Sequence, residues 1–134
     1  MKRLRRAGRS YASGVPSKGP LITVAETKAF VARCDGRLTD AEKDGVVEML
    51  ARNPLAGDVI PGTGGVRKVR VATGSRGKSG GARVIYYFYN MSMPVFLLTV
   101  YGKNERADIA PSVKAELTKL VPVLIADYAS RRTS

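Results

Sequence analysis

A stretch without acidic residues, from Val59 to Asn104, most constrains what this chain can fold into. It contains seven Lys or Arg side chains and no Asp or Glu. Three runs with the patterning of strands lie within it, separated by glycine-rich segments at 62–65 and 74–81. A sheet with this much uncompensated positive charge favours a polyanionic partner, because phosphate neutralisation supplies most of the affinity in contacts with nucleic acid. RNA is the partner we expect.

Alternating apolar and polar residues predict three consecutive strands in this stretch. Short connections join them, so an antiparallel meander is the most economical arrangement. Lys68 and Arg70 are two residues apart and therefore share one face of the first strand. The predicted strands are Val66–Thr73, Ala82–Tyr89 and Pro94–Tyr101.

Helices are expected before and after the meander. Thr39 and Glu42 form a capping box, which predicts a helix that ends at Asn53-Pro54. A last helix begins at Pro111, and Pro122 should kink or divide it. The other predicted elements are a short strand at Leu21–Val24, a helix at Glu26–Cys34 and the full extent of the last helix, to about Ala129.

The length of 134 residues fits one small domain, which we place at 21–134. Residues 1–20 carry six Lys or Arg and no acid, so we expect them to form a basic, disordered arm. The formal net charge of +12 agrees with a nucleic-acid partner or an anionic surface.

Several kinds of site are excluded by composition. The chain has no His, which removes the usual zinc sites and the Ser-His-Asp and Cys-His catalytic arrangements. Cys34 is the only cysteine, so it forms no internal disulfide, and we expect a buried, unreactive thiol. We predict no metal, no cofactor and no membrane span, and a cytoplasmic location.

The segment 72–79, Ala-Thr-Gly-Ser-Arg-Gly-Lys-Ser, loosely fits a phosphate-binding loop. Such a loop must follow a strand and open a helix, whose first amides bind the phosphates. Here the sequence that follows is typical of a strand. A flexible basic hairpin loop is the better interpretation, and nucleotide hydrolysis is not expected.

Antiparallel pairing brings cations from separate strands to one side of the sheet. We expect this group to contain Lys68, Arg70, Arg83 and Lys103. By composition alone, a solvated positive face without catalysis is the commoner outcome. Glu105, the first acid after the basic stretch, is either a general base or a charge partner of Lys103 or Arg106. Asp58 is expected only to order a turn.

Tyrosines in the second strand add a second element of RNA recognition. Strand parity places Tyr87 and Tyr89 on the face of Arg83, where their rings can stack on bases, and Tyr86 with Phe88 on the opposite face. A β-bulge would invert this assignment. The full set of expected RNA contacts is Arg67, Arg76, Lys78, Tyr87 and Tyr89.

Three stretches of the sequence, at 53–71, 80–88 and 98–105, carry a resemblance to a known family. They resemble the RelE/HigB-type toxins of bacterial type II toxin–antitoxin modules, most closely the HigB-like branch. The resemblance covers roughly residues 21–130 and is strongest in the predicted sheet. It implies a compact α+β fold in which N-terminal helices and a C-terminal helix pack on a twisted, mainly antiparallel sheet. It also implies cleavage of mRNA on the ribosome and neutralisation by a cognate antitoxin, of helix-turn-helix type.

The family's active-site cations correspond to Lys68, Arg70 and Arg83 in this sequence. A position after the third strand that is often arginine is Asn104 here, with Lys103 beside it. A tyrosine that some members use in the C-terminal segment has no counterpart, because Ala110 stands nearby. This difference leaves the general base and the general acid open.

These observations lead to the hypothesis of a metal-independent endoribonuclease, in which the RNA 2′-hydroxyl attacks the neighbouring phosphate. A lysine crowded by like charges loses its proton more easily, so Lys68 or Lys103 is the expected base, with Arg70 and Arg83 holding the phosphate. The alternative is a basic protein that binds RNA or the ribosome without catalysis. A third possibility is that complex formation with a DNA-binding antitoxin is the main role.

Overall fold

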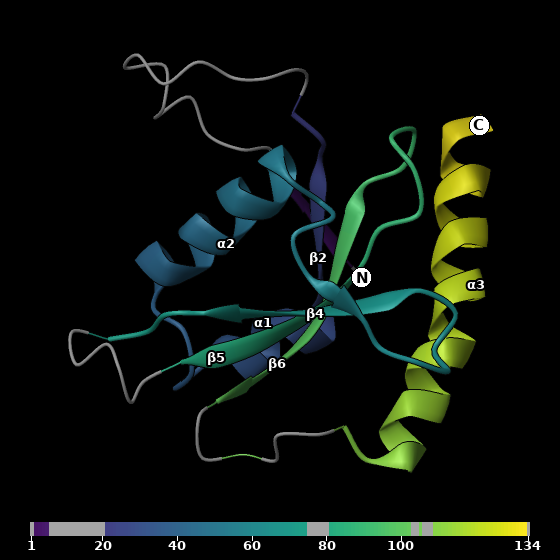
Figure 1. Ribbon diagram of the computed structural model, residues 1–134. Coiled ribbons are helices and arrows are strands. Elements are labelled where there is room, and N and C mark those ends of the chain that lie inside the picture. Colours follow the sequence, from purple (N-terminus) through teal and green to yellow (C-terminus); the bar gives the residue numbers. More distant parts are fainter. Residues whose placement is uncertain (1, 6–20, 75–80, 103–104, 106–108, 134) are drawn as a thin grey trace.

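The computed structural model describes residues 2–5, 21–74, 81–102, 105 and 109–133. Its strands form one six-stranded sheet, and Figure 1 shows α2 and α3 on opposite sides of it. The elements, in chain order, are β1 (Lys2–Arg5), β2 (Val24–Thr27), α1 (Lys28–Cys34), α2 (Asp40–Arg52), β3 (Asp58–Val59), β4 (Val66–Val71), β5 (Ala82–Tyr87), β6 (Val95–Gly102) and α3 (Pro111–Thr133).

The strand order in the sheet is β1-β2-β6-β5-β4-β3. β4, β5 and β6 are consecutive antiparallel neighbours, so the predicted meander is confirmed. β2 pairs with β6 in parallel, and the remaining pairings are antiparallel. This is the mainly antiparallel α+β fold expected from the sequence.

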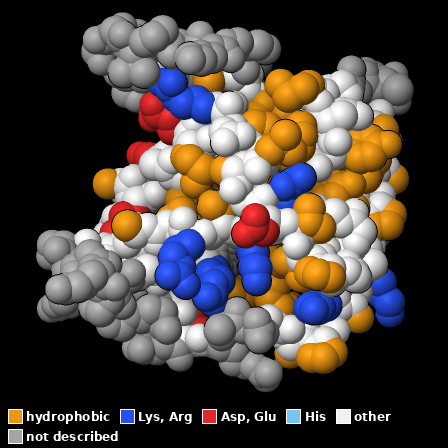
Figure 2. Space-filling model, in the orientation of Figure 1, with side chains coloured by type: hydrophobic (Ala, Val, Ile, Leu, Met, Phe, Trp, Pro, Cys, Tyr) orange, Lys and Arg blue, Asp and Glu red, His pale blue; other side chains and the backbone are white. Residues whose placement is uncertain are grey.

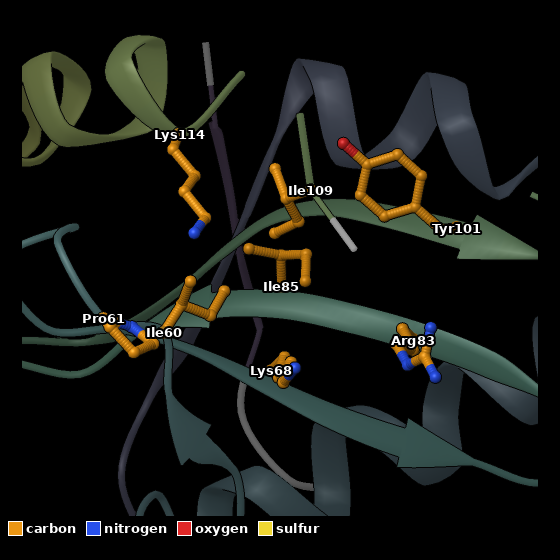
Figure 3. Close-up of a pocket in the computed structure, with 8 residues that line it drawn as sticks. All are labelled: Ile60, Pro61, Lys68, Arg83, Ile85, Tyr101, Ile109 and Lys114. Atoms are coloured by element: carbon orange, nitrogen blue, oxygen red, sulfur yellow. The ribbon is translucent and has the colours of Figure 1, made fainter. Parts of the chain in front are cut away.

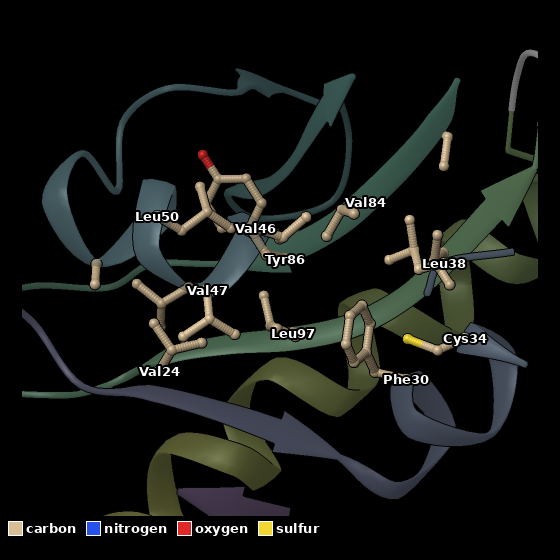
Figure 4. Packing of buried hydrophobic residues seen from close by; sticks show 14 of the residues in the cluster. Val24, Phe30, Cys34, Leu38, Val46, Val47, Leu50, Val84, Tyr86 and Leu97 are labelled. Atoms are coloured by element: carbon tan, nitrogen blue, oxygen red, sulfur yellow. The ribbon is translucent and has the colours of Figure 1, made fainter. Parts of the chain in front are cut away.

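Each face of the sheet is covered by its own hydrophobic cluster, so β5 and β6 are buried on both sides. On one face, Phe30 of α1 and Leu50 of α2 pack with Val84, Tyr86 and other residues of the sheet (Figure 4). On the other face, apolar residues of α3 pack on β5 and β6. The residues that form this second contact are Leu117, Val121 and Leu124 of α3 and Ile85, Tyr87, Phe96 and Leu98 of the strands.

β6 carries one more residue than β5 needs for pairing. Ile85 is opposite Thr99, whereas the next residue, Tyr86, is opposite Leu97. Leu98 is therefore the additional residue of a β-bulge. Because the bulge lies on β6, the alternation of β5 continues unbroken, and Tyr87 stays on the face that the sequence predicts for it.

Hydrogen bonds of Tyr86 hold the loop before β4 against the centre of the sheet. Its buried hydroxyl donates to the carbonyl oxygen of Pro54 and accepts from the amide of Gly57, both at 2.8 Å. A Cβ at Gly57 would lie 2.5 Å from the carbonyl oxygen of Lys68, so only glycine lets the loop come this close to β4.

The capping box is confirmed. The Thr39 hydroxyl accepts from the Glu42 amide at 3.1 Å, and the Glu42 carboxylate accepts from the Thr39 amide at 2.8 Å. Glu42 also accepts from the Gly74 amide at 2.6 Å, so the start of α2 holds the chain just after β4. These backbone hydrogen bonds, first that from Thr39, lower the pKa of Glu42.

Other predictions about the elements are wrong. Residues 2–5 do not belong to a disordered arm, because they form β1 and pair with β2; residues 6–20 lie outside the described part of the chain. The first strand of the domain is Val24–Thr27 and not Leu21–Val24. Of the two outcomes predicted for Pro122, a kink or a division of the last helix, the division is wrong, because the helix continues to Thr133. The segment predicted as a loop before β4 contains the two-residue strand β3.

The substitution Tyr86→Phe tests the attachment of the loop to the sheet. It leaves a buried amide and carbonyl without their partner, so we expect the free energy of unfolding to fall by about 1–3 kcal/mol. Urea denaturation followed by circular dichroism measures this. The control is Tyr89→Phe, because the Tyr89 side chain is 54% exposed. Equal stability of the two variants would contradict the role given to the Tyr86 hydroxyl.

Candidate RNA-binding site

The register of the meander brings the predicted cations together on the face covered by α3. Arg70 of β4 is directly opposite Arg83 of β5, and Arg83 is opposite Tyr101 of β6. Lys68 is opposite Ile85, in the row next to Arg70. Side chains directly opposite each other in an antiparallel pair lie on the same face, so these cations form one group.

A pocket of about 250 Å³ lies beside this group, between the sheet and the first turn of α3 (Figure 3). The sheet contributes Lys68, Arg83 and Ile85, and the opposite wall includes Ile109 and Lys114. No Asp or Glu is among the described residues that line the pocket. The complete lining consists of Ile60, Pro61, Lys68, Arg83, Ile85, Tyr101, Ile109 and Lys114.

Two cations of the pocket, Lys68 and Lys114, differ from most other cations in the described residues. Neither Lys68 nor Lys114 forms an ion pair with a described carboxylate, and the same is true of Arg70. Figure 2 shows Lys and Arg side chains gathered in the lower half of the view, next to hydrophobic ones. The described ion pairs elsewhere are Arg33–Glu105, Arg37–Glu105, Lys43–Asp40, Arg52–Glu48 and Arg131–Asp127.

Asp58 does more than order a turn. It lies in β3 directly opposite Lys68, at the edge of the sheet, and is exposed to solvent. The two side chains do not form one of the described ion pairs. Asp58 therefore leaves the charge of Lys68 unpaired.

Arg67 does not belong to the pocket. It alternates with Lys68 and so faces the other side of the sheet, where its guanidinium donates to the carbonyl oxygen of Gly57 at 2.6 Å. This hydrogen bond supports the loop that Tyr86 also holds. The geometry therefore gives Arg67 a structural role and argues against the predicted contact with RNA.

The two tyrosines predicted to stack on bases have different surroundings. Tyr87 is on the face of Arg83, but only 5% of it is exposed, so its ring is part of the hydrophobic core and leaves no surface for a base. Tyr89 is 54% exposed, and its ring stacks on that of Tyr87 with the centroids 6.4 Å apart. Tyr89 alone of this pair is available to a base.

Three predicted site residues, Lys103, Arg76 and Lys78, lie outside the described residues. The segment that contains Arg76 and Lys78 joins two strands, β4 and β5. It is therefore not the strand-to-helix connection that a phosphate-binding loop of a nucleotide hydrolase requires. This agrees with the interpretation of the segment as a hairpin loop.

Glu105 is a charge partner and not a free base. Its carboxylate accepts from Arg37 at 2.8 and 3.0 Å, from Arg33 at 2.8 Å and from the amide of Gly102 at 2.5 Å. The hydrogen bond from Arg37, followed by that from Gly102, holds the pKa of Glu105 well below its usual range. The described partners are arginines of α1 and the turn after it, whereas Lys103 and Arg106, the partners that the sequence suggests, lie outside the described residues.

The same network supports one wall of the pocket. The Arg33 guanidinium lies over the ring of Tyr101, 5.1 Å from its centroid, and donates to the carbonyl oxygen of Val100 at 3.1 Å. The end of β6 is thus held by α1 through Arg33 and Glu105. Tyr101 lies in this end of β6 and lines the pocket.

The sequence alone assigned only Lys68 and Arg83 of the lining to the site, so Lys114 and Ile109 are among the residues that it missed. Lys114 lies on a helix whose orientation relative to the sheet has no signal in a single sequence, and Ile109 lies in the connection before it. Tyr101 was noticed only as one of several strand tyrosines. The pairing of Tyr101 with Arg83 is the observation that assigns it to the site.

Other candidate chemistry is absent from the described residues. No three of their Cys, Asp and Glu side chains come together in the way that a metal ion needs. Cys34 is buried in the core, and burial raises the pKa of its thiol, as expected for an unreactive cysteine. None of the described helices combines the length and the apolar character that crossing a bilayer requires.

We expect Glu105→Gln to lower the free energy of unfolding at neutral pH, because two arginines lose their charged partner. The folded-state pKa of Glu105 is depressed, so its contribution is complete above the ordinary value of about 4.3 and disappears as the pH falls through the folded-state pKa. The difference in stability between wild type and variant should therefore shrink in acid. Urea melts at pH 7 and pH 3 measure it. A constant difference would contradict the assigned charge state.

One comparison with known proteins bears on this site. The model of the family described as RelE toxin of the RelE / RelB toxin–antitoxin system matches residues 25–130. The matched range contains every residue that lines the pocket. It covers most of the 134 residues, from within β2 to near the end of α3. The chain belongs to the RelE toxin family of toxin–antitoxin systems.

Proposed function

We propose that this toxin is an endoribonuclease that cleaves mRNA at the pocket between the sheet and α3. One observation carries the proposal: Lys68 and Arg83 line a single pocket in which no described lining residue is acidic. Such a site attracts a phosphate, because each cation that contacts the phosphate replaces a counterion of the RNA. Membership of a toxin family makes RNA cleavage the activity to test first.

The reaction that suits these side chains uses the RNA as its own nucleophile. The 2′-oxygen attacks the adjacent phosphorus while the bond from phosphorus to the 5′-oxygen breaks. The products are a 2′,3′-cyclic phosphate and a free 5′-hydroxyl. A base must take the 2′-hydroxyl proton, a donor must protonate the leaving 5′-oxygen, and cations must stabilise the charge on the phosphate.

We assign charge stabilisation to Arg83 and Arg70, which are direct cross-strand neighbours. A guanidinium presents two parallel donors to phosphate oxygens, so the pair can hold the phosphate in one orientation. Lys68 or Lys103 is the proposed base, and the exposed ring of Tyr89 is the proposed stacking surface for a base. Arg76 and Lys78 are proposed to contact the RNA backbone.

The proposal also includes a branch of the family, a partner protein, the ribosome and a cellular compartment. We place the chain in the HigB-like branch, on the resemblance in its sheet, and propose a helix-turn-helix antitoxin as its cognate partner. The ribosome is the proposed platform on which the mRNA is presented, with cleavage inhibiting translation. The cytoplasm is the corresponding compartment.

Arg83→Ala tests the site. We expect the rate of mRNA cleavage to fall about 100-fold or more, because one stabilising contact to the developing charge is lost. Primer extension on a translated message, with and without ribosomes, measures the rate. Labelling the free 5′-hydroxyl of the products tests the route of cleavage.

The control variant is Arg131→Ala, because Arg131 pairs with Asp127 at the far end of α3. It should cleave at the wild-type rate. Unchanged cleavage by Arg83→Ala would remove this pocket from the mechanism. Ribosome binding by the wild type without any cut message would support the alternative, a non-catalytic RNA-binding or ribosome-binding protein.

A further inference from the structure

We propose that α3 supplies part of the RNA-binding surface, with Lys114 contacting a phosphate and the apolar wall receiving the ring of one nucleotide. The inference rests on the proposed function, because it concerns the same pocket. It adds a residue from outside the sheet, and that residue has no part in the proposal above. It also states the size of the RNA unit that the pocket holds.

Lys114 faces the cations of the sheet across the pocket. It lies in the first turns of α3, and its ammonium group is directed toward the sheet in Figure 3. Lys68 and Arg83 line the same pocket from β4 and β5. Three cations on one pocket of about 250 Å³ repel one another, and a bound anion removes this cost. A phosphate between Lys114 and the sheet meets this requirement.

The backbone at Lys114 is held by the structure around it. The Lys114 amide donates to the carbonyl oxygen of Ala110 at 3.0 Å, and the Thr118 hydroxyl donates to the carbonyl oxygen of Lys114 at 2.7 Å. The same hydroxyl is 3.4 Å from the carbonyl oxygen of Gly62, next to the pocket residue Pro61. Leu117 then packs into the core below the sheet. The helix wall is therefore preorganised and costs little to order on binding.

The apolar part of the pocket limits which chemical group can bind beside the phosphate. Ile60, Ile85 and Ile109 lie on different segments and all line the same space. A flat ring fits against aliphatic side chains, whereas a fully hydrated phosphate does not. The volume of about 250 Å³ is below the usual range for a drug-sized ligand. One nucleotide, with its phosphate at the cations and its base against the isoleucines, matches both properties.

The test measures binding apart from cleavage. The probe is a short single-stranded RNA with 2′-O-methyl groups, which has no free 2′-hydroxyl and is not cut. We expect Lys114→Met to weaken its binding about tenfold, because a charge-assisted contact is lost while the apolar stem is kept. The slope of log affinity against log salt should become shallower by about 0.7, as for one phosphate contact on a single strand.

Two variants complete the design. Lys119→Met removes an exposed lysine of the same helix that does not line the pocket, and it should leave affinity and salt slope as in the wild type. Lys114→Arg retains the charge and should restore most of the binding. Thermal unfolding by circular dichroism should give the same transition for all three variants, since none of them alters the core.

The outcomes separate the two proposals. If the wild type binds and cleaves RNA but Lys114→Met has the affinity and salt slope of Lys119→Met, the role of α3 is wrong and the site on the sheet stands. If the wild type neither binds the methylated RNA nor cuts a translated message, the proposed function itself is wrong. If Lys114→Met loses affinity with the expected change in slope, Lys114 is a phosphate ligand.

Discussion

The double burial of β5 is the constraint on which the rest of this structure depends. Val84 and Tyr86 pack under α1 and α2, while Ile85 and Tyr87 pack under α3. Burial of these side chains on both faces fixes the strand, because a slip by one residue would exchange its two apolar sets. With β5 fixed, Arg83 has a fixed position, and the register places Arg70 beside it.

Placing like charges side by side costs free energy, and the structure uses its acids elsewhere. Glu105 joins Arg33 and Arg37 into a network that holds α1 to the end of β6. Glu42 takes part in the capping box at the start of α2, and its carboxylate accepts a hydrogen bond from Gly74, just after β4. These two carboxylates thus stabilise the frame, and no Asp or Glu is among the described residues that line the pocket. This separation fits a surface whose counterions come with the ligand.

Much of the fold could be predicted from the sequence, because its signals are local. Strand alternation, the capping box and the short connections define the meander and α2. The N-terminal end was harder: a basic, glycine-containing segment has the composition of a disordered arm, yet residues 2–5 pair with β2. That pairing depends on a distant strand, and a single sequence carries no local signal for it. The continuation of α3 through Pro122 likewise reflects packing on the sheet.

The site could be predicted only as far as the alternation of side chains along a strand determines which face each residue occupies. Alternation along the strand puts Lys68 and Arg70 on one face, but it does not indicate how deeply a side chain is buried. The buried Tyr87 and the exposed Tyr89 therefore could not be distinguished from the sequence. The same rule, applied to Arg67, would have placed it on the opposite face from Lys68. Lys114 was out of reach, since the direction in which a helix side chain points relative to a sheet depends on tertiary packing.

The additional residue at Leu98 has a consequence for the pocket. Along β6, Leu97 belongs to the cluster under α1 and α2, and if side chains alternated without interruption through Leu98, Tyr101 would face that side as well. Instead the strand changes phase once, and Tyr101 turns to the side of Arg83. A relative that lacks this residue would keep the later side chains of the strand on the same faces, so positions beyond Leu98 correspond by the face on which they lie and not by counting along the strand.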